Sequence, residues 1–207
     1  MAEEGDGAWA REPRRLFLAV LPTPEVRAAL VASQRALAPA LRRGAPAAPG
    51  NLHLTLAFLG MCDAGQEEAA VRALAAACAG QVPFALRLAE TGRFNKRRGD
   101  IVWQALEEDE GARELRALQA RLVGALHAEG LAKGVGVGDA YAPHVTLFRG
   151  ARDVRPEEGG AAAVSPAAVS PAAGVAWPVD SAALMGSHHP AGCALTYTEL
   201  VRVGFGG

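Results

Sequence analysis

The sequence is poor in cysteine, which excludes several classes of protein. Its 207 residues include three cysteines, at Cys62, Cys78 and Cys193. An odd, widely spaced set gives neither a disulfide framework nor the Cys/His spacing of a zinc site, and it favours a reducing compartment. We expect the three thiols to be small buried hydrophobic groups.

Long apolar runs are also missing. The first apolar stretch, residues 16–21, follows Arg14 and Arg15 and ends at Pro22. A signal peptide needs about 7–15 apolar residues and a membrane span about 18, so this stretch predicts a buried strand. We therefore expect a flexible N-terminal tail over residues 1–14 and a cytoplasmic, monomeric protein that does not contact a membrane.

Phosphate-binding loops and strong net charge are absent as well. The glycine-rich segment at 134–139 lacks both the Lys-Ser/Thr pair of a Walker loop and a preceding strand. A net charge of −1 excludes a globally basic RNA binder but allows a local basic groove. Since no metal-ligand cluster is evident either, we expect no required cofactor or metal. Aromatic residues make up only 5% of the chain, so the core should be rich in Leu, Val and Ala.

Periodicity predicts alternating strands and helices. An N-cap at Thr23 with Pro24 begins one helix, and Asp63 with Gln66 resembles the capping box of another. "RRGAPAAPG" and "ETGRFNKRRGD" are typical of a loop and a basic turn. The expected strands are 16–21, 52–59, 84–89, 101–106, 145–148, 179–185 and 195–203, and the expected helices are 24–41, 64–78 and 115–130.

One four-residue pattern occurs twice. "HLTL" begins at His53 and "HVTL" at His144, and each follows a strand and a helix. Five histidines and six threonines in 207 residues give about 0.14 His-x-Thr occurrences by chance. A lone histidine in an apolar strand is more often a core residue, but two matched occurrences indicate an internal duplication.

The spacing of the pattern has a direct chemical consequence. Side chains at i and i+2 of a strand share a face, so His53 lies beside Thr55, and His144 beside Thr146. If the two repeats face each other, two imidazoles and two hydroxyls converge. Two histidines can serve as general acid and general base near neutral pH, and two hydroxyls can bind the oxygens of a phosphate.

These signatures resemble those of the 2H phosphoesterase superfamily, and most closely its RNA 2′,3′-cyclic phosphodiesterase branch, first described as 2′-5′ RNA ligases. "RRLFLAVLP", "GDIVWQAL", "YAPHVTLFR" and "WPVDSAALMGS" extend the similarity along the chain. The resemblance implies an α+β, bilobal duplicated fold in which two antiparallel β-sheets with flanking helices enclose a central groove. We expect one such domain over residues 15–207, with a low-complexity surface loop at about 154–176.

The resemblance also implies roles for particular residues. His53 would be the proton donor and His144 the proton acceptor, although the sequence alone does not decide which is which. Thr55 and Thr146 would hold the phosphate, with Arg149 at the family's basic position and Ser187 near the groove. Strict alternation along the strand, however, points Arg149 away from His144.

A second basic segment contains Phe94 and Arg98. A base can stack on the ring while the cations contact the RNA backbone, but the same residues also fit a solvated hairpin tip. The pair His188–His189 has no counterpart in the family and is expected to lie in a solvated loop. His127, late in a helix, is expected to be structural or exposed.

The expected activity is metal-independent hydrolysis of RNA 2′,3′-cyclic phosphate ends to 2′-phosphates, reversible in principle as 2′-5′ RNA ligation. The partner would be an RNA with a cyclic end, such as a tRNA fragment, or a nucleotide. One alternative is a phosphodiesterase that acts on small cyclic phosphates or 2′-5′ oligonucleotides. Another is an RNA- or nucleotide-binding module without turnover.

Overall fold

A computed structural model describes residues 12–131, 141–153, 170–188 and 195–206. The helices are α1 (Pro24–Leu37), α2 (Ala64–Cys78) and α3 (Glu110–Ala128), with short 3₁₀ turns at Ala38–Ala40 and Pro49–Asn51. The strands are β1 (Arg14–Val20), β2 (Leu41–Pro46), β3 (Leu54–Cys62), β4 (Phe84–Phe94), β5 (Asp100–Leu106), β6 (Val145–Asp153), β7 (Ala176–Val179), β8 (Ser181–His188) and β9 (Thr196–Gly204).

Side-chain caps fix where the helices begin. The Thr23 hydroxyl accepts from Val26 N with Pro24 in the first turn, and Asp63 and Gln66 form a reciprocal capping box. Asp109 caps α3 in the same way by accepting from Ala112 N. The first two caps confirm the helix starts expected from the sequence.

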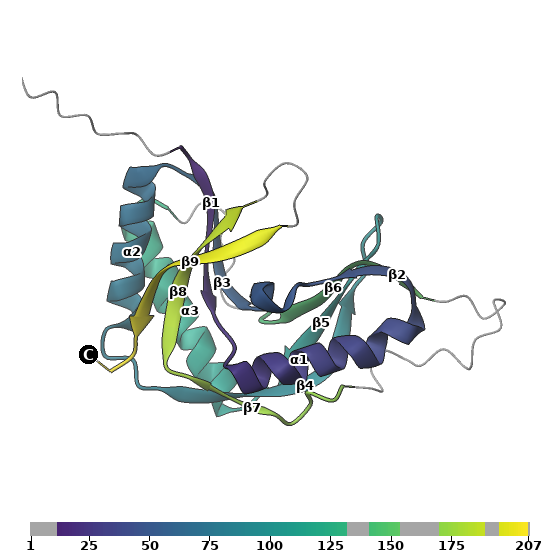
Figure 1. Cartoon of the computed structure of the whole chain (residues 1–207). Helices are drawn as coiled ribbons and strands as arrows, with labels where there is room; N and C mark the ends of the chain where they lie inside the picture. Colours follow the sequence, from purple (N-terminus) through teal and green to yellow (C-terminus); the bar gives the residue numbers. More distant parts are fainter. Residues whose placement is uncertain (1–11, 132–140, 154–169, 189–194, 207) are drawn as a thin grey trace, which may run out of the picture.

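The strands form two antiparallel halves that meet at one point. The order is β7-β4-β5-β6-β3-β1-β8-β9, with β2 added to the side of β6. Between β6 and β3 the only register pair is Leu54 opposite Val145, so the two halves join through the two signature strands. Figure 1 shows the halves at a steep angle to each other. The α+β, bilobal antiparallel fold is thus confirmed.

The helices pack across the two halves. α1 follows β1 in the chain but packs against β6, whereas α3 follows β5 and packs against both β4 and β3 (Figure 1). α2 lies beside α3 and covers β8 and β9. The core is therefore continuous across the two halves and consists mainly of Leu, Val and Ala, as expected.

Both signature strands contain a β-bulge at the leucine of the repeated pattern. Leu56 is the extra residue of β3 opposite β1, and Leu147 is the extra residue of β6 opposite β5. A buried glutamine amide from the exchanged helix reaches each bulge. Gln34 Nε2 donates to Leu147 O at 2.9 Å, and Gln119 Nε2 donates to Leu56 O at 3.3 Å. The bulges are thus matched features of the duplication.

Several segments differ from the sequence-based expectation. The "RRGAPAAPG" segment contains β2, because its backbone pairs with β6. β4 extends to Phe94 through part of the expected turn, and the expected 179–185 strand is two strands, β7 and β8. Residues 170–176 of the expected loop belong to the fold, since Ala172 is fully buried and its N–H donates to Ser33 Oγ. Residues 154–169, and 1–11 of the expected tail, lie outside the described residues.

Other expectations concern single groups. Cys62 and Cys78 are buried free thiols, as expected, and Cys193 lies outside the described residues. Among the described helices, none is long and apolar enough to cross a membrane.

The Gln34 amide supports two buried carbonyls, because its Nε2 also donates to Ala47 O at 2.9 Å. We expect Gln34→Met to lower the free energy of unfolding by about 2 kcal/mol, because both acceptors lose their side-chain donor. Urea unfolding measures this change. Arg35→Met, at an exposed position of the same helix, is the control and should stay within about 0.5 kcal/mol of wild type. Equal losses in the two variants would contradict a role for the amide.

Candidate active site

The two signature strands bring the histidines and threonines to one face. Leu54 and Val145 are buried opposite each other, so their neighbours in the chain lie on the opposite face of the sheet. In an antiparallel pair this register places His53 beside Thr146, and Thr55 beside His144. The convergence expected from the sequence follows from a single cross-strand pair.

His53 is held by backbone and aromatic contacts. Its Nδ1 lies 2.7 Å from Asn51 O and its Nε2 lies 3.0 Å from Thr55 Oγ1. Since a carbonyl can only accept, Nδ1 carries the hydrogen, and Nε2 is the nitrogen that exchanges protons. The rings of Phe17 and Tyr197 lie 4.8 and 5.1 Å away, centroid to centroid.

His144 has an equivalent arrangement in the other half. Its Nδ1 donates to Ala142 O at 2.8 Å, which again leaves Nε2 to exchange protons. Phe94 lies edge-on at 5.0 Å between ring centroids, and Trp103 lies at 6.0 Å. The Trp103 ring occupies the space where a side chain at position 92 would lie, so only glycine fits there.

Arg149 faces the site, contrary to the expectation from strict alternation. The bulge at Leu147 makes Leu147 and Phe148 both buried, and this shift of one residue returns Arg149 to the face of Thr146. In the first repeat, Leu56 and Ala57 are both buried and Phe58 takes the equivalent place, with 52% of its surface exposed. Each histidine is thus followed five residues later by a side chain on the site face.

Burial and positive charge keep both imidazoles neutral at neutral pH. Desolvation is the largest cause that lowers the pKa of His53 to about 4; the charges of Arg149 and His144 act in the same direction, while the hydrogen bond to Asn51 O opposes the shift. Desolvation also lowers the pKa of His144, followed by the charge of Arg149. Arg149 therefore acts electrostatically on both histidines.

Two cavities that share Arg149 and Tyr197 lie at the site, and His53 lines the smaller one. One, of about 260 Å³, contains His53, Thr146 and Arg149; the other, of about 630 Å³, contains Phe58, Arg149 and Ser187, and Tyr197 lines both. A larger cavity of about 830 Å³ lies at the α2–β4 connection and the start of α3 and contains neither histidine. Chemistry, rather than size, identifies the candidate site.

The remaining candidates lie in different places. Phe94 contacts His144, whereas Arg98 is exposed at the tip of the β4–β5 hairpin. His188 ends β8 at the rim of the larger of the two site cavities, His127 is exposed on α3, and His189 lies outside the described residues. Within the described ranges, no group of three or more His, Cys, Asp or Glu side chains is placed to hold a metal ion.

Two further residues were not identified from the sequence. Asn51 Nδ2 donates to Leu195 O and its Oδ1 accepts from Tyr197 N, which ties β9 to the backbone that holds His53. The Tyr141 hydroxyl donates to Thr55 O, from one signature block to the other. Asn51 and Tyr141 lie two and three residues before the two histidines, and no pattern in either block distinguishes them.

The fold and the site together define a class of protein. A duplicated antiparallel fold presents paired His-x-Thr strands in an open groove, and this arrangement can carry out acid–base chemistry on a phosphoester. Residues 13–190 match the 2′-5′ RNA ligase superfamily, and the chain belongs to that family. The resemblance to the 2H phosphoesterases is therefore confirmed.

Curated relatives have consistent names. The chain is 36% identical over 195 residues to the RNA 2′,3′-cyclic phosphodiesterase of Thermus thermophilus, covering 89% of this chain and 88% of that protein. It is 32% identical over 143 residues to the RNA 2′,3′-cyclic phosphodiesterase of Escherichia coli, covering 69% and 75%.

Solved structures agree with the family. Escherichia coli LigT in the apo form superposes with a TM-score of 0.70 at 28% identity, covering 94% of this chain and 99% of LigT. LigT complexed with 3′-AMP gives a TM-score of 0.69. The Thermus thermophilus protein TT0787 gives 0.68 at 30% identity, with 92% and 97% covered.

The pKa of His53 makes stability depend on pH. The native protein holds His53 neutral down to about pH 4, whereas the unfolded chain protonates it at its ordinary pKa of 6.5. This contribution to the free energy of unfolding is complete above pH 6.5 and is lost as the pH falls toward 4, by about 3 kcal/mol. Urea unfolding of wild type and His53→Gln at several pH values should show the smaller loss in the variant. The exposed His127→Gln is the control and should retain the wild-type loss; a His53→Gln curve parallel to wild type would contradict the assignment.

Proposed function

We propose that this protein is a phosphodiesterase that hydrolyses RNA 2′,3′-cyclic phosphate ends to 2′-phosphates. The single observation that carries the proposal is the pairing of Leu54 with Val145, which sets two His-x-Thr motifs side by side on one face. Family membership and the names of the relatives support the same activity. No step in the proposed reaction requires a metal ion.

Water attacks the phosphorus in line, and the bond from phosphorus to the 3′-oxygen breaks. His144 Nε2 takes the proton from the attacking water, and His53 Nε2 gives a proton to the leaving 3′-oxygen. The products are a 2′-phosphate and a 3′-hydroxyl. In the reverse direction the same groups would join a 5′-hydroxyl to the 2′-phosphate, but the high concentration of water favours hydrolysis.

The role of His53 as the acid requires bound substrate, because burial favours its neutral form in the free protein. An imidazolium in desolvated surroundings gives up its proton readily, because burial favours the neutral form. In the proposed complex, the negative charge of a phosphate beside Nε2 raises the pKa of His53 and so favours the protonated form that the acid needs. The hydroxyl of Thr55, which lies 3.0 Å from His53 Nε2, is then free to donate to a phosphate oxygen.

The remaining groups fit the substrate. Arg149 lies near both histidines and is suited to neutralise the phosphate, with Thr146 as a second hydroxyl donor. Phe58 presents an exposed ring on one side of the groove and Phe94 borders His144 on the other, so both can contact a base. Ser187 lines the cavity of Phe58 and offers a hydroxyl to the sugar.

A smaller substrate is the second candidate. The open cavities would also accept a nucleoside cyclic phosphate, and LigT has been solved with 3′-AMP. A binding module without turnover fits less well, because both histidines keep a proton-exchanging nitrogen.

The test is hydrolysis of a short RNA with a 2′,3′-cyclic end in the presence of EDTA. His53→Ala and His144→Ala should each lower kcat by about 100- to 10,000-fold, and Thr55→Ala or Thr146→Ala by about 10- to 1,000-fold. His127→Ala, exposed on α3, is the matched control and should keep full activity. Full activity in either active-site histidine variant would refute the mechanism.

A nitrophenyl ester distinguishes the two histidines, because its leaving oxygen needs no proton. It should restore the rate of His53→Ala and leave His144→Ala slow. Restoration of His144→Ala instead would reverse the two roles.

The pH profile tests the role of Arg149. Because burial and Arg149 lower the pKa of both histidines in the free protein, the bell-shaped profile of kcat/KM should lie at lower pH than that of kcat. Arg149→Gln removes one cause of the lowering, so its kcat/KM profile should move to higher pH while KM rises. Arg149→Lys is the control and should keep the wild-type profile. An unmoved profile in Arg149→Gln would show that Arg149 does not act on the histidines.

A further inference from the structure

The tip of the β4–β5 hairpin carries three consecutive cations. Lys96, Arg97 and Arg98 are all exposed, and they follow Phe94 directly after Asn95. None of the ion pairs among the described residues includes any of the three, whereas Arg93 and Arg152 nearby are paired. The tip therefore presents positive charge that the described part of the chain does not neutralise.

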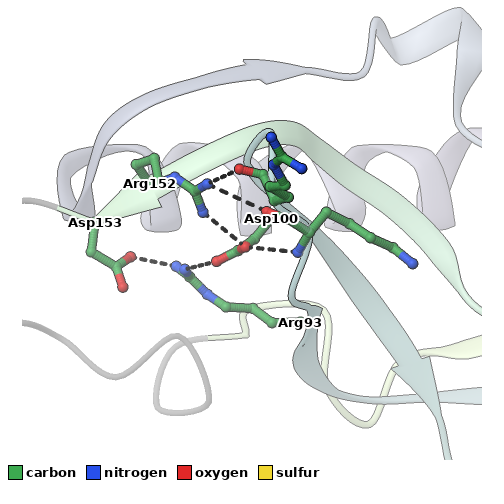
Figure 2. Close-up of polar contacts among 6 residues, drawn as sticks. Arg93, Asp100, Arg152 and Asp153 are labelled. Atoms are coloured by element: carbon green, nitrogen blue, oxygen red, sulfur yellow. Dashed lines mark hydrogen bonds and ion pairs between the residues drawn. The ribbon is translucent and has the colours of Figure 1, made fainter.

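Hydrogen bonds hold the backbone of the tip in place. Arg152 donates to Lys96 O at 3.3 Å and to Arg97 O at 2.9 Å. Asp100 Oδ1 accepts from Lys96 N and from Arg152, each at 3.1 Å (Figure 2). The tip is thus fixed to β6 through its main chain. The cationic side chains take no part in these hydrogen bonds and can contact a ligand.

The acidic residues around the tip are used within this network. Asp100 contacts Arg93 as well as Arg152, and Arg93 also pairs with Asp153 (Figure 2). The hydrogen bond from Lys96 N, followed by the charges of Arg152 and Arg93, lowers the pKa of Asp100, which stays ionised. Two carboxylates therefore balance two guanidinium groups, and the three tip cations remain in excess.

The tip lies next to the candidate active site. Gly99 packs against Gly150 so closely that a side chain at position 99 would meet the Gly150 backbone at 2.6 Å, and Gly150 follows Arg149. Phe94, whose ring borders His144, is two residues before Lys96, which is roughly 7 Å along a strand. The tip therefore lies on the same side of the second half as Phe94 and the strand that carries Arg149.

We infer that Lys96, Arg97 and Arg98 bind the phosphate backbone of the RNA that precedes the cyclic end. This inference rests on the proposed function and specifies its substrate class as an RNA chain rather than a mononucleotide. A nucleoside cyclic phosphate has only the phosphate that lies at the histidines. It has no further phosphate that the tip could bind. A single-stranded backbone supplies one negative charge per nucleotide, which matches a row of three cations.

The test compares two substrates. The double variant Arg97→Ala/Arg98→Ala is assayed on 2′,3′-cyclic AMP and on a single-stranded RNA of about ten nucleotides with a cyclic end. We expect kcat/KM for the RNA to fall about 10-fold and its log–log salt slope to shrink by about 1.4, since each lost phosphate contact removes about 0.7. Hydrolysis of the mononucleotide should stay within about twofold of wild type.

The matched control is Arg35→Ala/Arg113→Ala, which removes two exposed guanidinium groups from α1 and α3. It should behave as wild type on both substrates. An equal loss on the two substrates, or a loss on RNA no larger than that of the control, would overturn the inference.

If wild type hydrolyses neither substrate, the proposed function is wrong, but the RNA contact can still be tested. The test is then the binding of a labelled RNA of the same length that ends in a 2′-phosphate, measured by fluorescence anisotropy. Weaker binding by the tip variant alone supports the contact, and equal binding by all three proteins refutes it.

Discussion

The candidate site depends on one cross-strand pair, Leu54 opposite Val145. Buried apolar side chains fix this register, because a slip of one residue in either strand would turn that strand's histidine into the core. Each bulge then places a third side chain on the face of the histidine and threonine. This side chain is Phe58 in β3 and Arg149 in β6, and regular alternation would have turned it away. Gln34 and Gln119 donate to the carbonyls at the bulges from the buried side, so α1 and α3 help to hold the backbone that carries Arg149 and Phe58.

The electrostatic state of the site follows from the same packing. Phe17 and Tyr197 border one imidazole, and Phe94 and Trp103 border the other, so desolvation is the largest cause of the lowered pKa of each histidine. The ligand-free groove thus carries the charge of Arg149 beside two neutral rings. An anionic substrate would pair with Arg149 and would also raise the pKa of the two imidazoles. Substrate binding would therefore favour the protonated histidine that the reaction needs.

Much of this architecture is visible in the sequence. The repeated His-x-Thr-Leu pattern, the capped helices and the apolar strands predict the fold and the four central residues. The bulges are not visible, because they arise from the pairing of each signature strand with a strand distant in the chain, and this is why alternation misplaced Arg149. The sequence also does not predict β2, because Gly44 and Pro46 are poor strand formers. The segment becomes a strand because its backbone pairs with β6.

The crossing of the helices between the two halves has an evolutionary consequence. A single repeat, on its own, would lose part of its helix packing, because α1 contacts β6 and α3 contacts β3 of the other half. Two identical copies related by a two-fold axis through the signature strands would cover each other, as in a domain-swapped dimer. The present chain shares one feature with such a dimer, since α1 and α3 each contact a strand of the other repeat. Fusion would then have let the two copies diverge, so that one strand now carries a phenylalanine where the other carries an arginine.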